Sequence, residues 1–220
     1  MKISQRTLDI LKNYAMINPG IVVTPGNILR TIHPLEAMQA CATVQEKFEQ
    51  EFAIGNLPRF LSVISLFKEP DFTFNKNSVL IKEGKQEVEY VYSDKEVVVY
   101  QADDPPIYTS DIAFKIQNQV LTSISKALSI MQLQKLAIIG DGKKLILRGV
   151  DNKGISADTF SYDITETTEN FYALLSIEYI KFVDNDYDVI QNPKGATMFK
   201  SSDITYWVAN DKFEQYDKAA

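Results

Sequence analysis

The predicted order of helices and strands repeats once along the chain, and this repeat limits the possible folds more than any other feature. In the first half, apolar residues at helical spacing predict a helix that Ser4 caps and Pro19 ends. A second helix is predicted from its cap, Asn56, to Pro70. The strands of this half are predicted as a β meander over 20–54 and as single strands at 78–82, 88–92 and 97–101.

The second half follows the same order. A long helix is predicted at 117–130 and a short one at 176–182, so the long helices begin 113 residues apart and the second helices about 120 apart. Two similar halves explain this order better than one irregular domain does. The strands of this half are predicted at 135–140 and 144–150, joined by a turn at Asp141-Gly142, at 156–163, at 171–175, and at three places near the end.

A proline pair separates the two halves. Pro105 and Pro106 lack backbone donors, and Asp104 before them is restricted to extended geometry, so neither a helix nor a central strand continues here. We therefore expect one domain over 1–104 and another over 105–220. Each is of ordinary domain size.

Cysteine and histidine are too scarce for several common kinds of site. Cys41 is the only cysteine and His33 the only histidine, which excludes an intrachain disulfide and a Cys-rich zinc site and removes the commonest general base. The acidic run 184–188 has the carboxylate spacing of a calcium loop, but Val189 stands where glycine is needed and Gly195 where glutamate is needed. We expect no enzyme, no metal and no cofactor.

The chain has no predicted membrane segment. No apolar run approaches the roughly 18 residues needed to cross a bilayer, and the N-terminal residues do not resemble a secretory signal. We expect the protein to stay in the compartment where it is made, and its single cysteine fits a reducing cytosol.

Positive charge is concentrated on the predicted helices of an acidic chain. The whole chain carries a net charge of -6, but the four helical segments hold eight cations against only Asp9 and Glu178, which leaves about -12 for the rest. Such a distribution lets helices lie beside phosphates while the remaining surface avoids nucleic acid. In the third helix, one row opposite the apolar face contains Lys115, Gln119, Thr122, Lys126 and Ser129.

The helix faces lack the arginine, asparagine and glutamine clusters that read base edges, so they predict sequence-independent contact with the DNA backbone. A solvated helix face without a ligand is the simpler interpretation for any single lysine. Repetition over several helices favours DNA. The candidate DNA-facing residues are Lys2, Arg6, Lys12, Arg59, Lys68, Lys115, Lys126 and Lys181.

Three blocks of the sequence resemble the DNA polymerase sliding clamp of T-even-type phages. They are MKISQRTLDILKNYAMINPGI at 1–21, NLPRFLSVISL at 56–66 and KLAIIGDGKKLILRGVDNK at 135–153. The resemblance implies an α+β protein with the DNA clamp fold, built from two similar clamp domains with helices on the inner face and β-sheets on the outer face. It also implies a homotrimeric ring. Twelve helices around that ring leave a hole of roughly 24 Å, enough for duplex DNA.

The resemblance further implies the partners of this ring. It encircles double-stranded DNA without sequence preference, an ATP-driven clamp loader opens and closes it, and it tethers DNA polymerase, which raises processivity through effective concentration. Transcription factors are partners in T-even relatives, and the cytoplasm of an infected bacterial host is the expected location. An apolar pocket for partner peptides is expected among Tyr100, Ile107, Tyr108, Tyr206 and Trp207, although each could instead be an ordinary core or interface aromatic or apolar residue.

Two other classes of protein remain open from the sequence. An oligomeric β-rich phage structural protein would explain the strands and the acidity, but it leaves the acid-poor helices unexplained. An enzyme with a carboxylate or a Lys/Tyr site is supported by no group of residues. The mass of the particle in solution separates a three-chain ring from a larger structural assembly.

Overall fold

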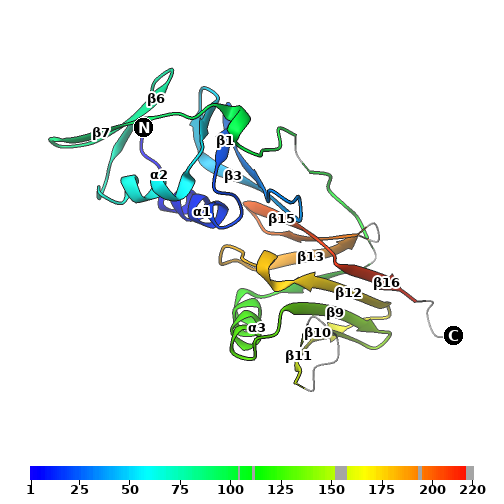
Figure 1. The fold of residues 1–220 in the computed structure, drawn as a ribbon. Helices are drawn as coiled ribbons and strands as arrows, with labels where there is room; N and C mark the ends of the chain where they lie inside the picture. Colours follow the sequence, from blue (N-terminus) through cyan, green and yellow to red (C-terminus); the bar gives the residue numbers. More distant parts are fainter. Residues whose placement is uncertain (104, 111, 152–157, 193–194, 217–220) are drawn as a thin grey trace. The chain divides into compact units, whose positions relative to one another are not determined.

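The structure, a computed structural model, describes residues 1–103, 105–110, 112–151, 158–192 and 195–216 (Figure 1). The chain divides into two compact units, Met1–Pro105 and Pro106–Ala220. The division falls between the two prolines at which the sequence analysis placed the domain boundary. That each unit is a clamp domain stays a prediction.

The first unit contains two α-helices among short strands. α1 covers Gln5–Ala15 and α2 covers Leu57–Ile64, and the two helices pack against each other. A single 3-10 turn, η1, covers Lys95–Val97. The strands are β1 (Ile21–Val23), β2 (Gly26–Ile32), β3 (Met38–Phe48), β4 (Phe52–Ile54), β5 (Asp71–Phe74), β6 (Ser78–Glu83) and β7 (Gln86–Val91).

The strands of the first unit pair in a nested order, so the predicted meander is wrong. β1 pairs antiparallel with β4, and the hairpin of β2 and β3 lies between them in sequence. β3 continues through the charged stretch 45–48, because Val44, Glu46 and Phe48 alternate inward while Gln45 and Lys47 face solvent. β5, β6 and β7 form a separate three-stranded sheet.

Polar side chains fasten α1 to the strands. The Ser4 side chain accepts a hydrogen bond from the Thr7 amide, as an N-cap does. Glu46 on β3 accepts hydrogen bonds from the Ser4 amide and from the Thr7 hydroxyl, so a buried carboxylate lies at the positive end of the helix. At the other end, the Tyr14 hydroxyl donates to the Leu29 carbonyl of β2 at 3.2 Å.

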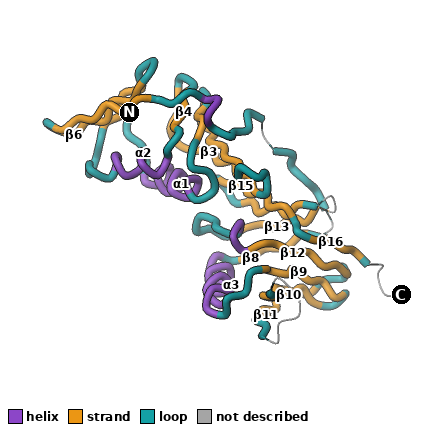
Figure 2. Tube along the Cα trace, in the orientation of Figure 1, coloured by secondary structure: helices purple, strands orange, loops and turns teal. Residues whose placement is uncertain are grey.

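The second unit contains one long α-helix and a larger proportion of strands (Figure 2). α3 covers Asn118–Ile130, and a 3-10 turn, η2, covers Ile177–Tyr179. The strands are β8 (Ala113–Ile116), β9 (Lys135–Asp141), β10 (Lys144–Val150), β11 (Phe160–Glu166), β12 (Asn170–Ser176), β13 (Tyr187–Asn192), β14 (Ala196–Lys200), β15 (Ile204–Ala209) and β16 (Lys212–Gln215).

Two antiparallel arrays form the framework of the second unit. One is a five-stranded sheet in the order β11-β10-β9-β12-β16, and the other runs β15-β14-β13-β8. The β9–β10 hairpin turns at Gly142, whose φ of 79° suits glycine, while the Asp141 carboxylate accepts hydrogen bonds from the amides of Lys143 and Lys144. α3 packs on β10 at Gly149, where an added Cβ would lie 2.1 Å from a Leu128 methyl carbon.

Three predictions about single elements are wrong. Four strands among the described residues, β13 to β16, follow η2 where three were expected. The fourth helix, expected over 176–182, is only the 3-10 turn Ile177–Tyr179. The strand expected at 97–101 is absent from the described part of the chain, where η1 ends at Val97. The strand expected at 156–163 is β11, which begins at Phe160, and residues 156–157 lie outside the described residues. No helix among the described residues is long and apolar enough to cross a membrane.

Candidate nucleic-acid interface

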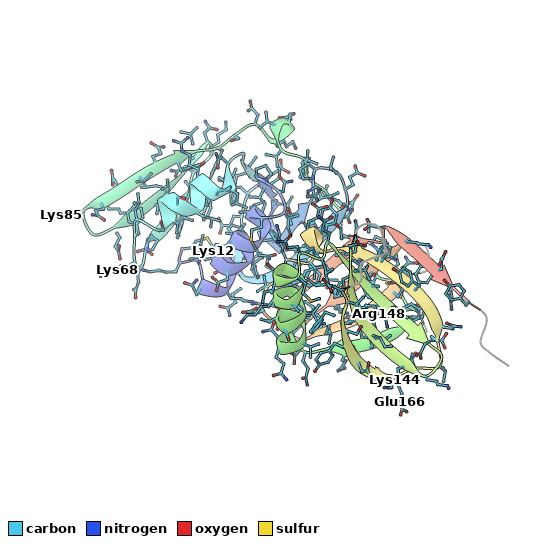
Figure 3. The ribbon with its side chains drawn as sticks, turned by 60° about the horizontal axis from the view of Figure 1, so that its bottom comes forward. Lys12, Lys68, Lys85, Lys144, Arg148 and Glu166 are labelled. Carbon is cyan, nitrogen blue, oxygen red and sulfur yellow. The ribbon has the colours of Figure 1, made fainter. Side chains whose placement is uncertain are left out.

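The exposed faces of α1 and α2 carry cations and few acids. On α1, Lys12 is exposed, and Arg6 is partly exposed one turn and a half before it. Asp9 is the single carboxylate of the helix, and it accepts from the Lys12 ammonium group at 3.2 Å. α2 has no acidic residue, and its exposed Arg59 lies in the first turn beside the cap Asn56. Lys12 is visible on α1 in Figure 3.

The exposed face of α3 carries small polar side chains with one cation. Its sequence contains no Asp or Glu, and Lys126 is its only basic residue. The buried side consists of apolar residues that face the sheet. The exposed polar positions on the opposite side are Gln119, Thr122, Ser123, Ser125, Lys126 and Ser129.

Lys115 does not lie on a helix, so its place in the predicted row on α3 is wrong. It belongs to β8, two residues before Gln117, the residue that precedes α3. Its ammonium group lies 3.5 Å from the Asp188 carboxylate of the neighbouring strand β13. The helical row therefore begins at Gln119, and the positive charge of Lys115 is locally offset.

Lys2 and Lys68 also lie beside carboxylates. The Lys2 ammonium group donates to the Glu69 carbonyl at 2.6 Å and lies 3.9 Å from the Asp71 carboxylate. The Glu83 carboxylate accepts from the amides of Lys68 and Glu69, and these two hydrogen bonds hold the pKa of Glu83 below its usual value. Lys68 follows α2 rather than lying within it (Figure 3).

Lys181 lies after η2, outside any helix, because the fourth helix is absent there. Its side chain lines a cavity of about 180 Å³ beside α3, together with Leu121 and Ile180. The eight candidate residues are all at least partly exposed, but the structure places only Arg6, Lys12, Arg59 and Lys126 on α-helices.

The acidic run 184–188 has structural partners. The Asp186 carboxylate accepts a hydrogen bond of 2.8 Å from the Asn118 amide, and so satisfies an unpaired donor in the first turn of α3. Asn185 donates to Ser201 and Asp203, and Asp188 faces Lys115. Within the described ranges, no group of three or more His, Cys, Asp or Glu residues could hold a metal ion.

The candidate partner-pocket residues do not form one exposed group. Tyr206 is fully buried in a ring cluster with Phe182, at 4.5 Å between centroids, and its hydroxyl accepts from the Val183 amide. Trp207 is 7% exposed, and its indole N–H donates to the Pro106 carbonyl at 3.0 Å. Ile107, next to that carbonyl, is 72% exposed.

The two remaining candidates have different surroundings. Tyr108 is partly exposed and belongs to the second unit, like Ile107. Tyr100 is 37% exposed and belongs to the first unit. Tyr206 and Trp207 are therefore buried residues, and Ile107, next to the carbonyl that the Trp207 indole binds, is the most exposed member of the set.

The fold is that of the ring-forming DNA clamps. A structure of Archaeoglobus fulgidus PCNA, reported as bound to the C-terminal region of FEN-1, matches with a TM-score of 0.69 at 9% identity over 96% of this chain and 99% of that one. PCNA from Entamoeba histolytica matches with a TM-score of 0.67 at 10% identity, over 93% of this chain and 94% of that one. The DNA polymerase III beta chain of Streptococcus pneumoniae gives 0.68 at 12% identity, and this chain covers 65% of its length. These likenesses define the DNA clamp fold.

Curated relatives give the class within that fold. The sliding clamp of Vibrio phage KVP40 is 26% identical over 96% of this chain and 99% of its own length. The sliding clamps of Escherichia phage RB69 and Enterobacteria phage T4 are 23% and 24% identical, each over 99% of this chain and all of their own length. No family model matches the chain. The chain is thus similar to T4-type phage sliding clamps along nearly its whole length, and sliding clamps are non-catalytic processivity factors.

Proposed function

We propose that this protein is a sliding clamp of phage DNA replication, which closes as a homotrimer around duplex DNA and tethers the DNA polymerase. The observation that carries the proposal is the similarity to phage sliding clamps over 96% or more of the chain, on a fold that PCNA shares. The cytoplasm of the infected host is the corresponding location.

The charge of the chain requires a topological mechanism. Three chains of net charge -6 form an acidic particle. Non-specific electrostatic binding to DNA is weak even for basic proteins, with dissociation constants of roughly 10⁻⁴ to 10⁻⁶ M at physiological salt. A closed ring keeps its DNA without tight contact, and a tethered polymerase then gains effective concentration rather than affinity for DNA.

The β11 edge of the sheet in the second unit, which pairs with no further strand among the described residues, supports association between copies. β11 is the last strand at one end of its five-stranded sheet; Tyr162 on it is 38% exposed, and Phe160 and Ile164 are partly exposed. An apolar edge strand tends to pair with another chain unless it is covered. We assign β11 to the contact between protomers.

The first unit offers a matching apolar segment. Val97 is 72% exposed and Val99 is 49% exposed, whereas Val98 between them is buried against Val22 and Ala53. Val97 ends the turn η1 and Val99 lies two residues beyond it, and both side chains are exposed. Apolar contact of Val97 and Val99 in one protomer with β11 of the next would generate a head-to-tail ring.

The inner wall of this ring differs from the twelve helices expected from the sequence. Each chain contributes three α-helices within its described residues, with the turn Ile177–Tyr179 in place of a fourth. The candidate DNA-facing residues on or beside these elements are the proposed contacts with the DNA backbone. An ATP-driven loader is the proposed means of opening the ring, and late transcription factors are further proposed partners.

The partner-peptide site is proposed at the start of the second unit. Pro106 is fixed by the Trp207 indole, which leaves the neighbouring Ile107 exposed for an apolar contact. Tyr108, which is partly exposed in the same unit, is the aromatic candidate of this site. Replacement of Ile107 by aspartate is expected to weaken polymerase binding while the mass of the ring stays unchanged.

The particle mass and a processivity assay test the proposal. The wild-type protein is expected at three times 24.9 kDa, and Tyr162→Asp together with Val97→Asp at 24.9 kDa. Leu35→Asp is the control, because Leu35 is 78% exposed in the turn between β2 and β3. On a long primed template with polymerase and loader, wild type lengthens the products and the double variant does not. A wild-type monomer without stimulation would refute the proposal, and a much larger assembly would favour a structural protein.

A further inference from the structure

The helix surfaces of the two units differ in charge. On α1 and α2, Arg6, Lys12 and Arg59 face one carboxylate, Asp9, which leaves a net charge of +2. On the helical elements of the second unit, α3 and η2, Lys126 stands against Glu178, a net charge of 0. Asp184 and Asp186 follow η2 and are exposed.

A carboxylate at the start of α3 adds to the difference in charge between the two units. Asp186 is held at the first turn of α3 by the Asn118 amide. A carboxylate at this end offsets the partial positive charge of the helix and repels a phosphate. In the first unit, the carboxylate at the start of α1, Glu46, is buried, unlike the exposed Asp186. The cap of α2 is the neutral amide of Asn56, which accepts from the amide of Arg59.

The rest of the α3 surface is hydroxylated rather than charged. Thr122, Ser123, Ser125 and Ser129 are exposed along it, with Gln119 at its start. Hydroxyl and amide groups meet phosphates and the DNA hydration layer through hydrogen bonds, directly or through water, without releasing counterions. Such a surface gives contacts that are easily exchanged and depend little on salt.

We propose that α1 and α2 of the first unit hold the DNA backbone by charge, whereas α3 of the second unit gives the duplex a nearly uncharged hydroxylated surface to move along. This inference rests on the proposed function, since it concerns DNA inside a clamp ring. A trimer then presents three cationic sectors that alternate with three neutral ones. The duplex spends most of its time against α1 and α2.

A matched pair of substitutions tests this division. Arg59→Gln and Lys126→Gln each remove one positive charge from an exposed helix position, and neither residue has an ion pair among the described residues. Binding to a short linear duplex is measured over a range of salt concentrations. For each contact that Arg59 makes, its loss should reduce the slope of log affinity against log salt by about 1. The wild-type advantage then shrinks about three- to fourfold between 50 and 200 mM salt.

Lys126→Gln is expected to reduce that slope clearly less, because the duplex meets α3 less often than α1 and α2. The double variants Lys12→Gln/Arg59→Gln and Lys126→Gln/Lys181→Gln, equal in charge change, should enlarge the contrast. An equal or larger change of slope for the second-unit variants would overturn the inference. Retention of wild type on end-blocked DNA is measured in parallel, and its absence would refute the proposed function whichever slope changes.

Discussion

The two units support their long helix in different ways. In the first unit, α2 lies against α1 and buries Leu57, Phe60 and Ile64. In the second unit, the corresponding stretch after β12 is a single 3-10 turn, and a cavity of about 180 Å³ remains between α3 and Ile180. A repeated order of elements therefore does not require repeated helices, because α3 is held instead by close packing on β10 at Gly149.

The largest expected effect is a loss of stability when Phe60 of α2 no longer fills its place in the core of the first unit. Phe60 is 4% exposed and meets the Tyr90 ring edge-on at 5.0 Å, so Phe60→Ala should lower the free energy of unfolding by roughly 3–5 kcal/mol. Ile180→Ala, the comparison variant in the second unit, should cost about 1 kcal/mol because Ile180 is only half-buried. Denaturant unfolding measures both, and equal costs would contradict the contrast between the units.

Gly149→Val tests the close packing of α3 on β10, which supports the long helix of the second unit. The new side chain would collide with Leu128 and Leu133 and displace α3 from β10, at a cost of roughly 3 kcal/mol. Hydrogen exchange should show α3 losing protection while α1 keeps it. The neighbouring Ile146→Val on the opposite face of β10 is a mild control. Unchanged protection of α3 would mean that Gly149 is not its support.

Glu46 should make the first unit sensitive to acid. Burial raises the pKa of Glu46, but the hydrogen bonds from Thr7 and Ser4 outweigh it and hold the pKa below the ordinary value of 4.5. The folded state is therefore favoured above pH 4.5, and this contribution is lost as the pH falls through the lowered folded pKa. Glu46→Gln should cost about 1–2 kcal/mol at neutral pH and lose less stability on acidification, as measured by unfolding at several pH values.

The control for Glu46 is Asp186→Asn at the first turn of α3. Asp186 is exposed, so its replacement should change stability by less than about 1 kcal/mol. A larger loss of stability from Asp186→Asn than from Glu46→Gln would reverse the expected difference between the units.

The smallest expected effect concerns Trp207. Trp207→Phe removes one hydrogen bond to the Pro106 carbonyl and should cost about 1 kcal/mol. If that bond orders the segment around Ile107, the variant should bind a polymerase C-terminal peptide more weakly. Unchanged peptide binding would remove Trp207 from the partner site. Isothermal titration calorimetry measures the binding and does not depend on the fluorescence of the tryptophan that the variant lacks.

Local signals in the sequence were enough to predict much of the fold. The hairpin turn at Asp141-Gly142 and the helices α1, α2 and α3 follow from capping residues, apolar spacing and turn chemistry. The prediction of a helix at 176–182 is wrong because a short apolar run fits a helix and a turn equally well. Nested pairing of β1 with β4 depends on contacts that local patterns do not encode.

The candidate site was less predictable than the fold. Charge counting by segment found the exposed cations of α1, α2 and α3, but it ignored where each helix begins, so it placed Lys115 on α3. It also counted charges within helices only, and so missed Asp71, Glu83 and Asp188 on neighbouring strands. The alternation of Val44, Glu46 and Phe48 is the one sequence signal that could have revealed a buried carboxylate.

Retention on DNA with blocked ends tests the central claim most directly. Protein is loaded onto a primed circle, the free protein is removed, and the amount bound is followed before and after a single cut opens the circle. The account predicts that the protein stays on the closed circle in moderate salt and leaves within the time needed to slide off once the cut is made. Equal loss from cut and uncut DNA would contradict a ring that holds its DNA by encircling it.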